Sequence, residues 1–212
     1  MRLVIFGPQG AGKGTQAGRI SEKYGIPSIA TGDIFRWAIK GGTALGIKVK
    51  EYVERGNLVP DELSIEVVRE RLTAEDCREG FLLDGFPRSL PQAEALDEIL
   101  AQKGAELDAA LVLDVPEEVS LRRLMGRRVC SNCGRTYSLG SPPEHDWVCD
   151  NCGERVEPRL DDEDEAAIRA RLESYHRTTE PLKTYYEEKG ILREIDGTQN
   201  PDDVFSSIVA AL

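Results

Sequence analysis

One segment of the chain, residues 7–15 with the sequence GPQGAGKGT, has the residue types of a loop that holds phosphate groups. Its glycines allow backbone N–H groups to converge on phosphate oxygens, and Lys13 adds a positive charge that reaches the terminal phosphates. An apolar run at residues 3–6 precedes the segment and predicts a buried strand, and a helical pattern follows over residues 13–24. Because strand, loop and helix occur in the required order, we interpret the segment as a phosphate loop and not as a plain glycine-rich turn.

The position after Lys13 departs from the usual phosphate-loop pattern, in which a Ser or Thr there holds Mg²⁺. Gly14 occupies that position and Thr15 follows one residue later, so magnesium must be held differently. Asp84 is the candidate, because it follows an apolar run and should emerge at the carboxyl end of a core strand, where open α/β sheets bind ligands. Asp114 ends the next apolar run and is a second candidate, although the Val-Pro after it suggests the start of a helix.

Four of the five cysteines form two Cys-x-x-Cys pairs separated by residues 134–148, a spacing typical of zinc sites. A glycine follows each pair and favours the tight turn that brings the thiolates to one ion. Four thiolates leave no open position for a substrate, so we expect a structural ion, whose binding contributes on the order of 10 kcal/mol to its segment. Two disulfides are the alternative, which a reducing compartment disfavours. The predicted ligands are Cys130, Cys133, Cys149 and Cys152.

The sequence shows no Ser-His-Asp set and no poised general base, which bears on the reaction. A hydroxyl acceptor usually needs a base, whereas a nucleotide phosphate has a second pKa of about 6 and is already ionised at neutral pH. Transfer from phosphate to phosphate then needs positioning, Mg²⁺ and positive charge. Arginines near the motifs above supply that charge, namely Arg36, Arg88, Arg123, Arg127, Arg159 and Arg171.

Apolar runs alternate with helical patterns along the chain, which predicts a parallel sheet with helices on both faces. The runs cover residues 3–6, 81–83, 109–113 and 192–195. Residues 30–59 have helical patterns without a clear strand and predict a small helical lobe, whereas residues 126–163 predict a compact insertion, which we call the lid. Residues 164–188 resemble one long helix that Pro181 must kink or divide. The core domain is expected at residues 1–29, 60–125 and 164–212.

The composition is that of a globular protein: of 212 residues, 40% are hydrophobic and 31% are charged. No stretch approaches the roughly 18 apolar residues of a spanning helix, and no signal peptide precedes the first strand, so we expect a cytoplasmic protein. With 38 acidic and 27 basic residues, the formal net charge is −11. That charge argues against nucleic acid and membrane surfaces as partners.

Five segments, in order, resemble motifs of the adenylate kinase family in its long form with a zinc-bearing lid. They read GPQGAGKGTQ at 7–16, TGD at 31–33, GFLLDGFPR at 80–88, GRR at 126–128 and IDGT at 195–198. The resemblance spans essentially the whole chain. It implies an α/β fold with a P-loop NTPase-type parallel sheet, an AMP-binding lobe at 30–59 and a zinc lid at 126–163. It also implies a monomer that transfers the terminal phosphoryl group of Mg·ATP reversibly to AMP, giving two ADP.

The resemblance also implies a role for individual residues, carried over motif by motif. The residues implied for ATP are Gly10, Ala11, Gly12, Lys13, Gly14, Thr15, Arg123, Arg127 and Gln199. Those implied for AMP are Thr31, Arg36, Leu58, Val59, Gly85, Arg88, Gln92, Arg159 and Arg171, with Gln92 reading the adenine edge. The catalytic set comprises Lys13, Asp84, Arg88, Arg127, Arg159 and Arg171.

One departure from the family concerns Arg159, which is one residue farther from Arg171 than the family's spacing. A one-residue bulge at residues 161–163 would restore its position, and without the bulge its phosphate contact would be lost; we favour the bulge. Two alternative functions are weighed. A kinase for UMP or CMP would share the fold, but Gln92, Thr31 and the long lid favour AMP. A zinc-ribbon nucleic-acid binder with a P-loop is disfavoured by the acidic charge.

Overall fold

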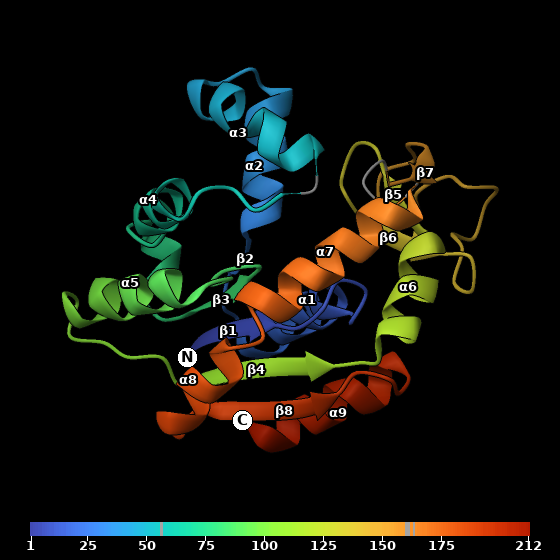
Figure 1. The fold of residues 1–212 in the computed structure, drawn as a ribbon. Helices are drawn as coiled ribbons and strands as arrows, with labels where there is room; N and C mark the ends of the chain where they lie inside the picture. The colour runs from blue at the N-terminus through green and yellow to red at the C-terminus, as the bar shows by residue number, and fades with distance from the viewer. Residues whose placement is uncertain (56, 160–161, 163) are drawn as a thin grey trace.

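A parallel five-stranded sheet forms the centre of the protein in the computed structural model, which describes residues 1–55, 57–159, 162 and 164–212 (Figure 1). All four neighbouring pairs of its strands are parallel, so their carboxyl ends lie at one edge of the sheet. The order across the sheet is β2 (Ser28–Ala30), β3 (Phe81–Asp84), β1 (Arg2–Phe6), β4 (Ala109–Asp114) and β8 (Leu192–Asp196).

Helices cover both faces of this sheet because its strands are apolar on both sides. Leu3 and Ile5 of β1 pack into one hydrophobic cluster, and Val4 and Phe6 pack into the other. The first cluster also takes side chains of α1 (Lys13–Tyr24) and α9 (Pro201–Ala211). The second takes side chains of α4 (Asp61–Arg71), α5 (Leu90–Ala101) and α8 (Leu182–Glu188).

Two parts extend from the core: a pair of helices within the predicted small lobe and a second, three-stranded sheet within the predicted lid (Figure 1). The helices of the small lobe approach closely at Gly46, where a Cβ would lie 2.1 Å from the Ala38 carbonyl oxygen. The small lobe consists of α2 (Thr31–Lys40) and α3 (Ala44–Glu54). The lid sheet has the order β6 (Thr136–Ser138), β5 (Arg127–Cys130) and β7 (Val156–Pro158), and it lies between α6 (Glu117–Met125) and α7 (Glu165–Thr178) in the chain. A short 3-10 helix covers Glu75–Cys77.

Each inserted part has a small cluster of packed side chains. In the lid, Cys130, Tyr137, Cys149 and Val156 are buried together, and Trp147 packs against them. In the small lobe, the buried side chains come from α2, α3 and the segment that follows them. Both clusters are small beside the two hydrophobic clusters of the core.

The predicted parallel sheet flanked by helices and its four predicted strands are confirmed, and the structure adds one further strand to that sheet. The edge strand β2 was not predicted, because it has only three residues and adjoins a segment of helical pattern. The helix expected over 164–188 is divided as Pro181 requires, with α7 ending at Thr178 and α8 beginning at Leu182. Within the described part of the chain, no helix combines the length and apolar character needed to cross a membrane.

Candidate active site

The phosphate loop lies between β1 and α1, at the carboxyl edge of the sheet. A Cβ on Gly7 would lie 2.4 Å from the Leu113 carbonyl oxygen, so glycine lets the loop pack against β4. Gly12 precedes α1 with a φ of 97°, and no side chain caps the first turn of α1. The N–H groups of that turn therefore have no side-chain cap and are placed to bind an anion. Lys13 Nζ donates to the carbonyl oxygens of Gly7 and Pro8, both at 2.8 Å.

Lys13 and Asp84 form the charged centre of the site. Burial lowers the pKa of Lys13 to about 8, although the Asp84 carboxylate opposes this shift. Arg88, Arg127 and Arg171 lower the pKa of Lys13 further, which shows that all three charges act at the phosphate loop. Burial also raises the pKa of Asp84, against the opposing effect of Lys13 and Arg88.

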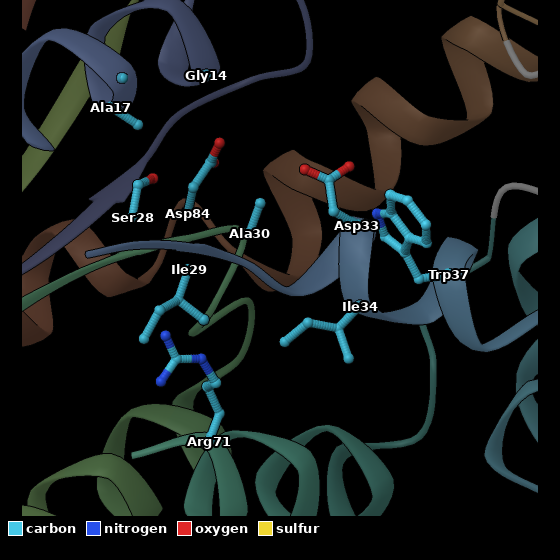
Figure 2. A pocket seen from close by; sticks show the side chains of 11 residues that line it. Gly14, Ala17, Ser28, Ile29, Ala30, Asp33, Ile34, Trp37, Arg71 and Asp84 are labelled. Carbon is cyan, nitrogen blue, oxygen red and sulfur yellow. The ribbon is translucent and has the colours of Figure 1, made fainter. Parts of the chain in front are cut away.

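Asp84 lies at the end of β3 beside the start of α1, where a Cβ on Gly14 would be 3.7 Å from Asp84 Oδ2. Asp84 and Asp33 line a cavity of about 520 Å³ together with residues of β2 and with Trp37. Figure 2 shows these side chains from close by. Two carboxylates beside the phosphate loop fit the oxygen ligands or water contacts that Mg²⁺ requires. Asp114, the second candidate, is exposed and lies 3.5 Å from Lys183 Nζ.

The loop after β3 connects the core to the small lobe through hydrogen bonds to Gly85. The Gly85 carbonyl oxygen accepts a hydrogen bond from Thr31 Oγ1 at 2.9 Å and another from Arg88 Nε at 2.8 Å. Gly85 has a φ of +78°, and a Cβ there would lie 2.9 Å from Arg88 Nη2. Glycine at position 85 thus leaves room for the Arg88 guanidinium to fold over the loop. In α2, Arg36 lies one helical turn after Asp33 and forms an ion pair with it.

Gln92 is buried at the start of α5, and both ends of its amide are hydrogen-bonded. Its Oε1 accepts from the Arg88 N–H at 2.8 Å, and its Nε2 donates to Asp61 Oδ1 at 2.6 Å. Asp61 Oδ2 accepts from Ser89 Oγ at 2.9 Å. Sequence reasoning missed Asp61, because an acidic residue after a proline resembles an ordinary first turn of a helix. Leu58 and Val59 lie shortly before it, and Val59 is buried.

Two arginines of the predicted catalytic set meet at a carboxylate that the sequence did not single out. Asp162 Oδ2 accepts from Arg127 Nε at 2.6 Å, and Asp162 Oδ1 accepts from Arg171 Nη1 at 2.8 Å. The Asp162 side chain is only 2% exposed. Among the described residues, Arg127 Nη2 is buried and has no hydrogen-bond partner.

Arg159 lies near the same group of charges. Burial lowers the pKa of Arg88 and of Arg127, and the positive charge of Arg159 lowers both further. The Asp162 N–H donates to the Arg159 carbonyl oxygen at 2.8 Å. Residues 161 and 163 of the expected bulge lie outside the described residues, so the bulge itself stays a prediction.

The remaining ATP residues gather beside the phosphate loop. Arg123 of α6 donates from Nη1 to the Gly197 carbonyl oxygen at 2.8 Å and from Nη2 to that of Thr198 at 3.3 Å. Gln199 is exposed, and its Nε2 donates to Asp196 Oδ2 at 3.3 Å. Of the phosphate loop, Gly10 packs against α6, where a Cβ would lie 2.8 Å from the Ser120 carbonyl oxygen. The other loop residues that the sequence implied for ATP are Ala11, Gly12, Gly14 and Thr15.

The four lid cysteines lie together, with their sulfur atoms all within 4.8 Å of one another. Cys130 and Cys149 are buried, and Cys133 and Cys152 are exposed. Burial raises the pKa of the Cys149 thiol, but hydrogen bonds from Tyr137 and from backbone N–H groups lower it to about 6. Burial raises the pKa of the Cys130 thiol to about 11, so that thiol would release its proton on binding a metal. The four clustered sulfur donors fit a closed, four-thiolate zinc site.

Comparisons with known proteins agree along the length of the chain. The sequence model of the family described as "Adenylate kinase" matches residues 5–191. The chain is 52% identical over 209 residues to an adenylate kinase of Clostridium tetani, covering 98% of this chain and 96% of the relative. It is also 52% identical over 213 residues to adenylate kinases of Carboxydothermus hydrogenoformans and Archaeoglobus fulgidus, which covers 100% of this chain and 99% and 98% of those relatives. The protein is therefore a phosphotransferase that belongs to the adenylate kinase family.

Proposed function

We propose that the family's reaction, the reversible transfer of the terminal phosphoryl group of Mg·ATP to AMP, takes place between the phosphate loop and Arg88. The observation that carries this proposal is the convergence of charge. Lys13, Arg88, Arg127 and Arg171 come from four different segments, yet Arg127 and Arg171 bind the same Asp162 carboxylate, Arg88 donates to the loop after β3, and all three positive charges lower the pKa of Lys13. Such a concentration of positive charge in a chain of net charge −11 supports a site for several phosphate groups.

ATP binds in this proposal with its phosphates on the loop residues 10–15. Lys13 exchanges its hydrogen bonds with the Gly7 and Pro8 carbonyl oxygens for phosphate oxygens, because a charged partner is the stronger one. Arg123 covers the adenine, and Gln199 lines the adenine site chiefly through its backbone. The buried Nη2 of Arg127 supports the placement of the transferring phosphate, since this donor has no hydrogen-bond partner within the described part of the chain and is suited to an anion.

AMP binds on the small-lobe side of the site. Arg36 and Arg88 bind its phosphate, and Arg159 and Arg171 reach the phosphoryl group as it moves between the nucleotides. Thr31, Leu58, Val59 and Gly85 surround the base and ribose, and Gln92 reads the adenine edge. Supporting this arrangement, Thr31 and Arg88 donate to the same Gly85 carbonyl oxygen, so the base side and the phosphate side of the pocket share one anchor.

The chemistry that these residues perform is positioning and charge stabilisation. The AMP phosphate is ionised at neutral pH and attacks without a general base. The arginines stabilise the negative charge that spreads over the transferring oxygens, and Lys13 holds the donor phosphates in line. Mg²⁺, held by Asp84 directly or through water, would neutralise charge on the ATP phosphates.

The lid and the small lobe close over both nucleotides in this proposal, because water left in the site would compete as acceptor. Their boundaries at residues 30–59 and 126–163 are part of the proposal. Labels at positions 50 and 141 test it: a bisubstrate analogue should shorten the distance between them, and an unchanged distance would contradict closure.

We further propose that zinc fills the lid cluster as a structural ion held by Cys130, Cys133, Cys149 and Cys152. The closed donor set supports this role, because it leaves no position for substrate. The protein is proposed to act as a monomer in the cytoplasm. Its net charge of −11 supports the absence of nucleic-acid and membrane-surface partners.

A coupled assay of ADP formation tests the proposal, with Mg·ATP as donor and AMP, UMP, CMP and GMP as separate acceptors. Rapid turnover with AMP alone is expected. Preference for a pyrimidine nucleotide would keep the reaction and contradict the base-reading role of Gln92. No transfer to any acceptor would refute the proposed function.

A further inference from the structure

The Gln92 amide is fixed by two groups of opposite character. The Arg88 backbone N–H is only a donor, and it points to Oε1 at 2.8 Å. The Asp61 carboxylate oxygen is an acceptor, and it receives Nε2 at 2.6 Å. An amide side chain that rotates by 180° exchanges its donor and its acceptor. In this structure such a rotation would place Nε2 against the Arg88 N–H and Oε1 against the carboxylate, so only one orientation is compatible with both neighbours.

Asp61 is itself held in place. Its second oxygen accepts from Ser89 Oγ at 2.9 Å, and the same hydroxyl caps α5 by accepting from the Gln92 N–H at 3.4 Å. Asp61 lies in the first turn of α4, where a carboxylate is favoured by the helix dipole. Two helices from separate parts of the chain are thus joined through one carboxylate, which leaves the Gln92 side chain little freedom.

We propose that Asp61 determines which purine the acceptor site takes, by holding the Gln92 amide in the orientation that matches adenine. The proposal rests on the proposed function, in which Gln92 reads the base of AMP. With one bond made at each end, Gln92 keeps one acceptor lone pair and one N–H for the base. Adenine presents a 6-amino donor beside a ring-nitrogen acceptor, which matches that pair. A 6-oxopurine presents an acceptor beside an N–H donor, the reverse pattern.

The fixed Gln92 amide discriminates between purines, because its donor and acceptor match adenine and do not match a 6-oxopurine. A locked amide facing a 6-oxopurine leaves polar groups buried without partners, and sites of this kind reject such analogues strongly. An amide released from Asp61 is able to rotate and offer the reverse pattern, at the expense of its bond with the Arg88 N–H. Asp61 acts through Gln92 and is therefore a positioning residue, whose loss changes the ratio between substrates more than it changes turnover.

The test compares AMP with IMP, a 6-oxopurine nucleotide that lacks the extra 2-amino group of GMP. The ratio of kcat/KM for AMP to that for IMP is measured at saturating Mg·ATP in the wild type and in Asp61→Ala. We expect the ratio to fall by about tenfold or more in Asp61→Ala, because the base that mismatches the fixed amide regains about one hydrogen bond when the amide is able to rotate. Asp61→Asn retains an acceptor oxygen for Nε2 and should restore most of the ratio.

Glu62→Ala is the matched control, because Glu62 belongs to the same first turn of α4 and is exposed. It should leave the ratio unchanged. An equal loss of kcat/KM for AMP and IMP in Asp61→Ala would show a merely structural role and overturn the proposal. Should that variant not fold, Asp61→Ser, whose hydroxyl is too short to reach Gln92, gives the same comparison.

The wild-type measurement separates this proposal from the proposed function. If the wild type transfers the phosphoryl group to AMP and Asp61→Ala has the same ratio of kcat/KM for AMP to that for IMP, only the role of Asp61 is overturned. A wild type without transfer to AMP refutes the proposed function, and the role of Asp61 falls with it.

Discussion

Replacing Asp162 by alanine removes the carboxylate that holds Arg127 and Arg171 side by side. The three side chains are 2%, 18% and 11% exposed, so solvent screens their charges little. Removal of one partner from a buried ion pair costs about 3–5 kcal/mol, because the remaining charge loses its compensation. Here two guanidinium groups lose the same carboxylate, beside the further positive charge of Arg159.

An exposed ion pair in the lid serves as the reference for the loss in free energy of unfolding. Arg155 and Glu157 lie 3.8 Å apart and are 80% and 58% exposed, so Glu157→Ala should cost no more than about 1 kcal/mol. Asp162→Ala should lower the free energy of unfolding by about 3 kcal/mol or more, a large share of the roughly 5–15 kcal/mol typical of a folded protein.

Urea unfolding followed by circular dichroism measures both differences on the intact chain. Added sulfate should narrow the difference in free energy of unfolding between Asp162→Ala and the wild type, because the anion compensates part of the positive charge of Arg127 and Arg171 that the Asp162 carboxylate no longer balances. Equal losses for Asp162→Ala and Glu157→Ala, with no selective effect of sulfate, would refute the reasoning from burial.

Three further predictions concern other parts of the site. Lys13→Met should raise the free energy of unfolding at pH 7 by about 1–3 kcal/mol, because burial lowers the pKa of Lys13 to about 8 and the charged form is disfavoured in the fold. Denaturation at several pH values should show this gain fading between about pH 8 and 10.5, as the lysine of the unfolded wild type also loses its proton. Cys130→Ser should lower the thermal midpoint of the lid and leave turnover at moderate temperature near that of the wild type; loss of turnover in a folded variant would contradict a structural metal. Arg88→Ala should reduce kcat with AMP by about 10²–10³, as steady-state kinetics would measure, and wild-type rates would argue against its role at the acceptor phosphate.

The parts of the site that the sequence predicted are those whose residues are close in the chain. The phosphate loop is one continuous segment, and the two cysteine pairs each close a short turn. The residues that form each of these sites are close together in the sequence, so their spacing alone predicts the phosphate loop and the metal site. The strands that present Asp84 and Asp114 were predicted for the same reason, because each is a short apolar run between helical patterns.

Asp61 and Asp162 were missed for the opposite reason. Each stands in an acidic stretch that resembles the solvated start of a helix, and nothing local separates it from its neighbours. Their partners, Gln92 for one and Arg127 and Arg171 for the other, are distant in the chain. Only the fold brings these groups together, so the carboxylates that position the site became visible in the structure alone.

The two tryptophans of the chain fall one in each inserted part. Trp37 of α2 is 63% exposed, whereas Trp147 packs against the buried cysteines of the lid. Indole fluorescence responds to the solvent and to the groups around the ring, and the core contributes no indole of its own. In Trp37→Phe the emission comes from the lid alone, and in Trp147→Phe it comes from the small lobe alone. The protein therefore carries a separate intrinsic fluorophore for each part that the proposed mechanism sets in motion.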